Sequence, residues 1–209
     1  MSASADVVVS SRWHPRRPQP RGEQRRLRLL EALERQLHGH RFAEVSIADV
    51  AEAAGLGRSA FYFYFSSKHD AVTQLLGDVF DEEIARVTEI LYGPGDPQDN
   101  IADGLRFIVE SWRQRRTLLC AMLDARDGDA EARLIWEHWL GRYEDFAADY
   151  ISTTAVVDPA ESRILAHVLI AMNERVLERH VRCDGDRQSA DELHGALVRV
   201  WRAALRRTP

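Results

Sequence analysis

The segment SIADVAEAAGLGRSAFYFYF (46–65) constrains the fold most, because it places two short helices on either side of a glycine. Ser46 can cap the first helix, with Asp49 at the third helical position of a capping box. The apolar face of this helix would consist of Ile47, Val50, Ala51 and Ala54. Gly55 ends it, and only Leu56 and Gly57 precede the next helix. This spacing is typical of a helix-turn-helix.

Five consecutive aromatic residues, 61–65, alternate in polarity as they would on a β-strand. Their flanks are helical, however. On a helix that covers 58–64, Phe61 and Phe65 lie one turn apart and can pack inward against Val50. Tyr62 lies about 100° away and directs its hydroxyl to solvent or phosphate. We therefore interpret the segment as the second helix of the pair.

The rest of the sequence predicts helices and no convincing strand, so the predicted fold class is all-α. Helical periodicity and breakers predict helices over 23–39, 66–91, 101–116, 118–127, 130–153, 159–183 and 189–206. The predicted organisation is a disordered basic arm (1–22), a three-helix helix-turn-helix domain (23–68) and a larger helical domain (69–209).

Charge is distributed unevenly along the chain. The net charge is −5, yet residues 1–68 hold 11 Lys and Arg against 7 Asp and Glu, while the remainder holds 17 against 26. This predicts a module that faces an anion, attached to a body that avoids polyanions. The arginines of the arm suit either a solvated tail or contact with DNA phosphate. The N-terminus lacks an apolar leader and no apolar run could span a membrane, so we expect a cytoplasmic protein.

The segment SIADVAEAAGLGRSAFYFYFSSKHD resembles the TetR family of bacterial transcriptional repressors in its capped helix, glycine turn, Tyr-x-(Tyr or His)-Phe and following lysine. The resemblance extends over essentially the whole length. It implies a ligand-responsive repressor that binds a palindromic operator on double-stranded DNA as a homodimer and is released by a small apolar or amphipathic effector. It implies no cofactor and no metal.

The resemblance assigns residues 57–64 to the recognition helix. The DNA-binding residues that it implies are Ser46, Gly57, Arg58, Ser59, Ala60, Tyr62, Tyr64 and Lys68. Arg58 is the expected base contact, because a guanidinium can donate two hydrogen bonds to guanine. The tyrosines and Lys68 are expected on the DNA backbone. Gly57 departs from the Ser or Thr usual in the family, which removes one possible phosphate contact.

In the larger domain, aromatic and apolar residues recur at helical spacing, which suits either core packing or a ligand pocket. The predicted ligand-binding residues are Ile101, Leu105, Ile108, Trp112, Trp136, Trp139, Leu140, Tyr143, Asn173, Leu177 and Trp201. Asn173 lies on an otherwise apolar face, so its amide must close an internal network or face a ligand.

A weaker resemblance is to the ethionamide-repressor type within the family, based on FYFYF with SK, MNER (172–175), Trp136 and LVRVW. It favours the ligand pocket over simple core packing. Ile101, Ile170 and Glu178 depart from that type, so the cavity should differ in shape and polarity. Glu174 and Arg175 are expected in a structural ion pair or network.

The last two helices resemble the pair through which the family dimerises as a four-helix bundle. Their apolar residues Leu193, Leu197, Val198, Val200 and Trp201 exceed what one buried stripe requires. A dimer would place two recognition helices about one DNA turn apart. Filling of the pocket would then shift the fourth helix and release the operator.

Three alternatives compete with a ligand-responsive repressor. No histidine or cysteine pair has zinc spacing, GRSAF is not a nucleophile elbow, and no glycine loop could cradle phosphate, so an enzyme is disfavoured. An effector-independent DNA-binding protein would not need the ring-lined face. A transcriptional activator of the same fold would contact DNA in the same way. The sequence leaves open the operator, the regulated genes, the effector and the number of dimers per operator.

Overall fold

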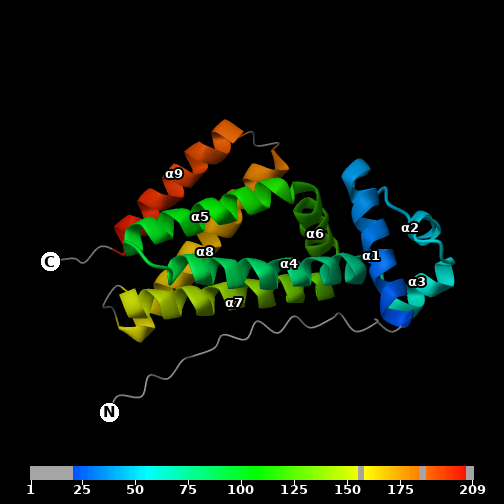
Figure 1. The fold of residues 1–209 in the computed structure, drawn as a ribbon, viewed down its shortest axis with the longest axis horizontal. Helices are drawn as coiled ribbons and strands as arrows, with labels where there is room; N and C mark the ends of the chain where they lie inside the picture. The colour runs from blue at the N-terminus through cyan, green and yellow to red at the C-terminus, as the bar shows by residue number, and fades with distance from the viewer. Residues whose placement is uncertain (1–20, 155–157, 184–186, 206–209) are drawn as a thin grey trace, which may run out of the picture.

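The computed structural model describes residues 21–154, 158–183 and 187–205, and within these ranges the chain is helical and contains no strand (Figure 1). The predicted all-α class is confirmed. The helices are α1 (Arg21–Gly39), α2 (Ile47–Ala53), α3 (Arg58–Tyr64), α4 (Lys68–Leu91), α5 (Pro97–Gln114), α6 (Arg116–Gly128), α7 (Ala130–Thr154), α8 (Pro159–Arg182) and α9 (Arg187–Ala204).

Some helix boundaries differ from the predicted ones. We predicted a loop over 92–100, but α5 begins at Pro97, because Asp96 caps it by accepting from the Gln98 N–H at 2.7 Å and Pro97 suits the first helical position. Helix α9 begins at Arg187 instead of residue 189. Helix α1 begins at Arg21, inside the predicted arm, and residues 1–20 of that arm lie outside the described residues.

Helices α1 to α3 form the predicted helix-turn-helix at one end of the molecule (Figure 1). Ser46 caps α2 by accepting from the Asp49 N–H at 3.1 Å. Gly55 has a φ of 68°, in the left-handed region that glycine adopts without a Cβ penalty, and this turns the chain toward α3. Phe61 and Phe65 are buried with ring centroids 5.2 Å apart, so the aromatic run is helical as far as Tyr64 and two of its five rings belong to the core.

Helix α4 joins this domain to the rest of the chain. Ser67 caps it, and the Lys68 ammonium in its first turn donates to the backbone carbonyls of Phe42 and Val45, the latter at 2.8 Å. Burial lowers the pKa of Lys68. The loop between α1 and α2 is thereby fastened to the start of α4.

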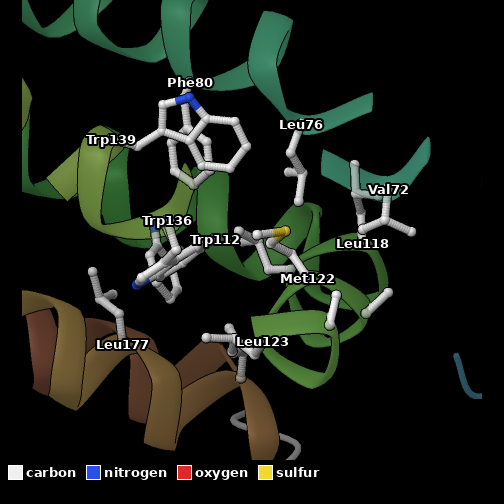
Figure 2. Close-up of a cluster of buried hydrophobic side chains, with 14 of the residues drawn as sticks. Val72, Leu76, Phe80, Trp112, Leu118, Met122, Leu123, Trp136, Trp139 and Leu177 are labelled. Atoms are coloured by element: carbon white, nitrogen blue, oxygen red, sulfur yellow. The ribbon is translucent and has the colours of Figure 1, made fainter. Parts of the chain in front are cut away.

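The larger domain packs α5 and α7 against α4, α8 against α7, and α9 against α5, while α6 contacts α1, α4 and α8 (Figure 1). Val72 and Leu76 of α4 lie beside Leu118 and Met122 of α6, and the aromatic rings gather around Phe80 further along α4 (Figure 2). One buried hydrophobic cluster extends from Leu29 to Leu205. The predicted boundary between 68 and 69 therefore crosses a continuous core, and it stays a prediction.

We predict that Lys68→Met destabilises the protein by about 2 kcal/mol, because a charged donor with two backbone acceptors is lost from a half-buried site. Urea unfolding followed by circular dichroism would measure this. Arg41→Met is the control: Arg41 lies in the same loop in an exposed pair with Glu44, and its removal should change the free energy of unfolding by no more than about 0.5 kcal/mol. Equal effects of the two substitutions would contradict the prediction.

Candidate nucleic-acid interface and ligand cavity

The outward face of α3 carries Arg58, Ser59, Tyr62 and Phe63, all exposed. The Tyr62 side chain is 47% exposed and Phe63 80%. An Arg58 guanidinium N–H donates to the Tyr62 hydroxyl at 3.2 Å, and the guanidinium lies 5.6 Å from the centre of the Tyr62 ring. This hydrogen bond raises the pKa of Arg58. The face thus presents the Arg58 cation beside exposed aromatic side chains. Phe63 was not among the predicted DNA-binding residues.

The other predicted DNA-binding residues lie around this face with different degrees of exposure. Ser46 and Gly57 are exposed, and Gly57 begins α3 without a side-chain cap. Ala60 and Tyr64 are half-buried. Lys68 directs its ammonium at the two carbonyls of the α1–α2 loop. Contact of these residues with DNA stays a prediction, and for Lys68 the structure shows an anchoring role within the domain.

All eleven predicted ligand-binding residues line one cavity of about 90 Å³, enclosed by α4, α5, α7, α8 and α9. They are Ile101, Leu105, Ile108, Trp112, Trp136, Trp139, Leu140, Tyr143, Asn173, Leu177 and Trp201. Trp112, Trp136, Trp139 and Leu177 converge from three of these helices (Figure 2). That these residues bind a ligand stays a prediction.

The cavity has further lining residues beyond the predicted ligand-binding residues. They are Phe80, Val87, Leu91, Gly104, Phe146, Ala147, Tyr150, Ile170 and Glu174. Phe80, Val87 and Leu91 belong to the apolar stripe of α4, and helical spacing alone does not distinguish a cavity wall from packed core. Residues 146, 147 and 150 continue the row 136, 139, 143 at steps of three and four, so helical spacing on α7 could have identified them.

Two adjacent residues of α8 fix two of the cavity's tryptophans. The Trp136 indole N–H donates to a Glu174 carboxylate oxygen at 3.1 Å, and the Trp201 indole N–H donates to the Asn173 amide oxygen at 3.1 Å. The polar atoms of both rings are therefore satisfied by protein, and their apolar faces are left to the cavity. Asn173 meets both of the expected alternatives, since it closes an internal hydrogen bond and lines the cavity.

A buried carboxylate lies behind the cavity wall. Glu83 of α4 is 2% exposed; it accepts a hydrogen bond from the Ser111 hydroxyl of α5 and one at 2.9 Å from the Tyr143 hydroxyl of α7. Arg115 in turn donates to the Ser111 oxygen at 2.7 Å. Burial raises the pKa of Glu83 despite these partners, and burial together with Glu83 raises the pKa of Tyr143 well above its ordinary value.

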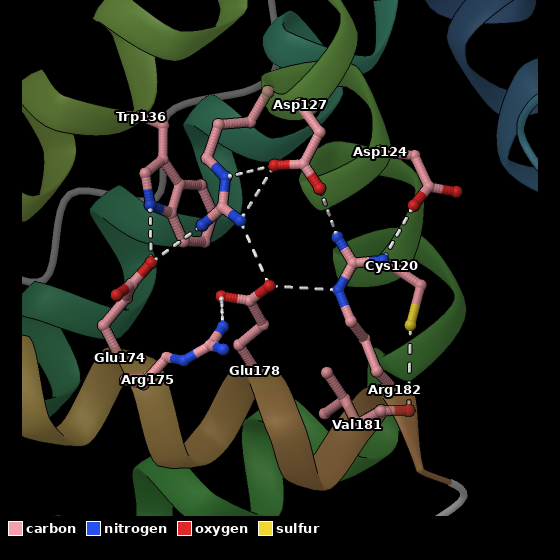
Figure 3. A network of polar contacts seen from close by, with 10 residues as sticks. Cys120, Asp124, Asp127, Trp136, Glu174, Arg175, Glu178, Val181 and Arg182 are labelled. Carbon is pink, nitrogen blue, oxygen red and sulfur yellow. Dashed lines mark hydrogen bonds and ion pairs between the residues drawn. The ribbon is translucent and has the colours of Figure 1, made fainter.

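An ion-pair network joins α6 to α8 beside the cavity (Figure 3). Arg126 contacts Glu174 at 2.9 Å and Glu178 at 3.1 Å, and Arg182 also contacts Glu178 at 3.1 Å. Arg175 pairs with Glu178 and not with Glu174, so the expected network is present but not as a direct Glu174–Arg175 pair. Burial alone would raise the pKa of Glu178, but hydrogen bonds and charge from Arg126 and Arg182 hold it below its ordinary value.

Two family descriptions match the chain. "Bacterial regulatory proteins, tetR family" matches residues 29–73, which include the helix-turn-helix, and "Transcriptional regulator EthR, C-terminal domain" matches residues 101–205, which include most of the cavity wall. The chain therefore belongs to the TetR family of DNA-binding transcriptional regulators, a family of repressors and not of enzymes.

Within that family the chain is EthR-like. It is 27% identical to the transcriptional regulator EthR of Mycobacterium tuberculosis strain H37Rv, over 96% of each chain. It is 26% identical to EthR of Mycolicibacterium smegmatis, over 89% of this chain and 88% of that one.

Solved structures share the fold at lower sequence identity. A TetR-family regulator from Syntrophomonas wolfei superimposes with a TM-score of 0.70 at 18% identity, over 88% of this chain and 95% of that one. FadR from Bacillus subtilis, in complex with stearoyl-CoA, superimposes with a TM-score of 0.65 at 15% identity, over 83% of this chain and 96% of that one.

Across the described helices, none has the combination of length and apolar character needed to cross a bilayer.

Proposed function

We propose that this protein is a ligand-responsive repressor that binds a palindromic operator as a homodimer and is released by a small apolar effector. The observation that carries the proposal is that one helix, α4, contacts the helix-turn-helix domain at one end and forms part of the cavity wall further along. Its first turn contacts the α1–α2 loop through Lys68, while Phe80, Val87 and Leu91 line the cavity. A change in the cavity that moves α4 would therefore move α3 against DNA.

The exposed face of α3 supports sequence-specific binding in the major groove. Arg58 is exposed at the start of the helix, where side chains of recognition helices reach base edges. Its guanidinium can donate to guanine O6 and N7, and the contact with Tyr62 limits its rotamers. Tyr62, Tyr64 and Ser46 are assigned to the DNA backbone.

We predict that a random duplex library incubated with the protein near physiological salt yields a palindromic motif. Arg58→Ala should flatten this motif at one position in each half-site and weaken binding to the selected operator about thirtyfold or more, since the dimer loses two bidentate contacts, one in each half-site.

The control is Arg86→Ala, which removes the same charge from an exposed surface pair on α4 and should leave the motif unchanged. A folded, dimeric protein that enriches no motif would contradict the proposed function.

The cavity wall supports an effector that is apolar and uncharged. Among the described lining residues Glu174 is the only Asp, Glu, Lys, Arg or His, and Arg126 and Trp136 already engage it. A ligand carboxylate would meet this carboxylate and no lysine, arginine or histidine of the wall. Burying an anion without a partner is costly, whereas an uncharged chain gains from leaving water.

We predict that 1-dodecanol raises the melting temperature of the protein and that dodecanoate, with the same chain length, raises it much less; either chain is larger than the cavity of about 90 Å³ and enters it only by widening it. Binding at about 100 times Kd would contribute about 2.7 kcal/mol, which corresponds to several degrees in a chain of this size. Thermal unfolding by circular dichroism at matched concentrations would show the difference. Equal shifts would contradict the uncharged effector, and no shift with either would favour an effector-independent protein.

The last two helices leave apolar side chains on the surface of the protomer. Ile164 and Val168, one turn apart on α8, are 66% and 57% exposed, and Val200 of α9 is also exposed. Of the α9 residues that we had counted as excess, Leu197, Val198 and Trp201 are buried within the protomer and Leu193 is half-buried, because α9 packs against α5. The face proposed for dimerisation is therefore carried mainly by α8.

We predict that Val168→Glu converts the dimer into a monomer, because it places a charge in an apolar interface, and that operator binding is lost with it. Size-exclusion chromatography with light scattering would measure the mass. Leu134→Glu is the matched control, since Leu134 is an aliphatic residue of similar exposure, 66% against 57% for Val168, but lies on α7. A wild-type monomer, or a Val168→Glu dimer, would contradict the proposed interface.

A further inference from the structure

Glu83 and Tyr143 make a buried connection between α4 and the cavity. The Tyr143 side chain lines the cavity, and its hydroxyl donates to the Glu83 carboxylate at 2.9 Å. The Tyr143 ring also lies edge-on to Phe80 of α4, with centroids 6.1 Å apart. The same side chain therefore touches both the space that a ligand would occupy and the helix that carries the DNA-binding domain.

Burial makes this hydrogen bond difficult to exchange for water. Glu83 is 2% exposed, and it accepts hydrogen bonds from the hydroxyls of Ser111 and Tyr143. If a ligand pushed Tyr143 aside while α4 stayed in place, one carboxylate oxygen would lose its donor inside the protein. Leaving a buried charged acceptor unsatisfied is strongly unfavourable. If Glu83 and α4 move together with Tyr143, the hydrogen bond is kept and this cost is avoided.

A second contact joins the same two helices without this constraint. Asp81 of α4 pairs with Arg142 of α7, one residue before Tyr143, and both side chains are substantially exposed. Exposed ion pairs exchange readily with water and contribute little. Of these two polar contacts between α4 and α7, only the buried one includes a residue that lines the cavity.

We infer that the Tyr143–Glu83 hydrogen bond is the contact through which a ligand in the cavity moves α4, which makes Glu83 a positioning residue for operator release. This rests on the proposed function, because it assigns the route of regulation at that same site. Glu83 lies about 22 Å along α4 from Lys68. A rotation or tilt of α4 at Glu83 is therefore carried to the α1–α2 loop by the Lys68 contacts.

The test compares the wild-type protein with Glu83→Gln and Asp81→Asn, two matched changes of a carboxylate to an amide on α4. Kd for the operator duplex obtained by selection is measured by fluorescence anisotropy without and with 1-dodecanol. Saturation by 1-dodecanol is established separately for each protein from its tryptophan fluorescence. The readout is the ratio of the two Kd values, which does not depend on how tightly each variant binds the alcohol.

We expect 1-dodecanol to raise Kd of the wild-type protein about tenfold, within the usual range of allosteric coupling. Glu83→Gln should reduce that ratio to less than about twofold, because an amide oxygen that loses the Tyr143 hydrogen bond costs less than a carboxylate oxygen that loses it. Asp81→Asn should keep a ratio within about twofold of the wild-type value. Tyr143→Phe, which keeps the ring and removes the hydroxyl, should reduce the ratio as Glu83→Gln does, and it carries the test if Glu83→Gln does not fold.

An unchanged ratio in both Glu83→Gln and Tyr143→Phe would overturn the inference while leaving the proposed function intact. An equal loss in Asp81→Asn would also overturn it, since any loosening between α4 and α7 would then be sufficient. A wild-type protein that binds its operator equally well with and without 1-dodecanol would overturn effector release itself, and the inference with it. The three failures are distinguishable.

Discussion

The structure depends on α4 being buried by different partners at its two ends. Ala71 and Val72 in its first turns belong to the core that α4 shares with α1 and α6, while Phe80 and Val87 belong to the wall of the cavity. A helix has a fixed rise, so these two environments are about 12 to 24 Å apart and rigidly related. Neither end can be repositioned without the other, because the hydrophobic cluster is continuous along the helix.

The cavity persists because its large side chains are held away from its centre. Trp136 and Trp201 are fixed by hydrogen bonds to adjacent residues of α8, and Tyr143 by its bond to Glu83. Phe80 packs against Trp139 with ring centroids 4.6 Å apart, and this packing restricts the rotation of both rings. A ring that turned inward to fill the space would leave a buried donor or acceptor unsatisfied, so the wall remains open. Polar pairing within the wall thus explains how an apolar space is maintained.

The fold and much of the cavity could be predicted because their signals are local. The helix-turn-helix follows from Ser46, Gly55 and the spacing of apolar residues, and the cavity residues of α5, α7 and α8 recur at helical intervals. The start of α5 at Pro97 was missed because glycine and proline obscured a cap that Asp96 provides.

Contacts between distant segments could not be predicted. The partners of Lys68 and Glu83 lie 23 to 60 positions away in the chain, and no periodicity reports which carbonyl or hydroxyl a charged side chain will meet. The contribution of α4 to the cavity was missed for the same reason: an apolar stripe looks alike whether it faces packed side chains or a space.

Two kinds of side chain have different roles in the cavity wall. The polar pairs on α8 form a frame, whereas Ile101, Leu105 and Ile170 touch the space without any hydrogen bond of their own to lose. Exchanging one aliphatic side chain for another usually costs little when the volume is accommodated. The lining can therefore drift in sequence, and the molecules that fit can change, while the frame and its connection to α4 stay the same. Such an arrangement lets the same fold come to bind a different ligand while the contacts that connect the cavity to α4 are kept.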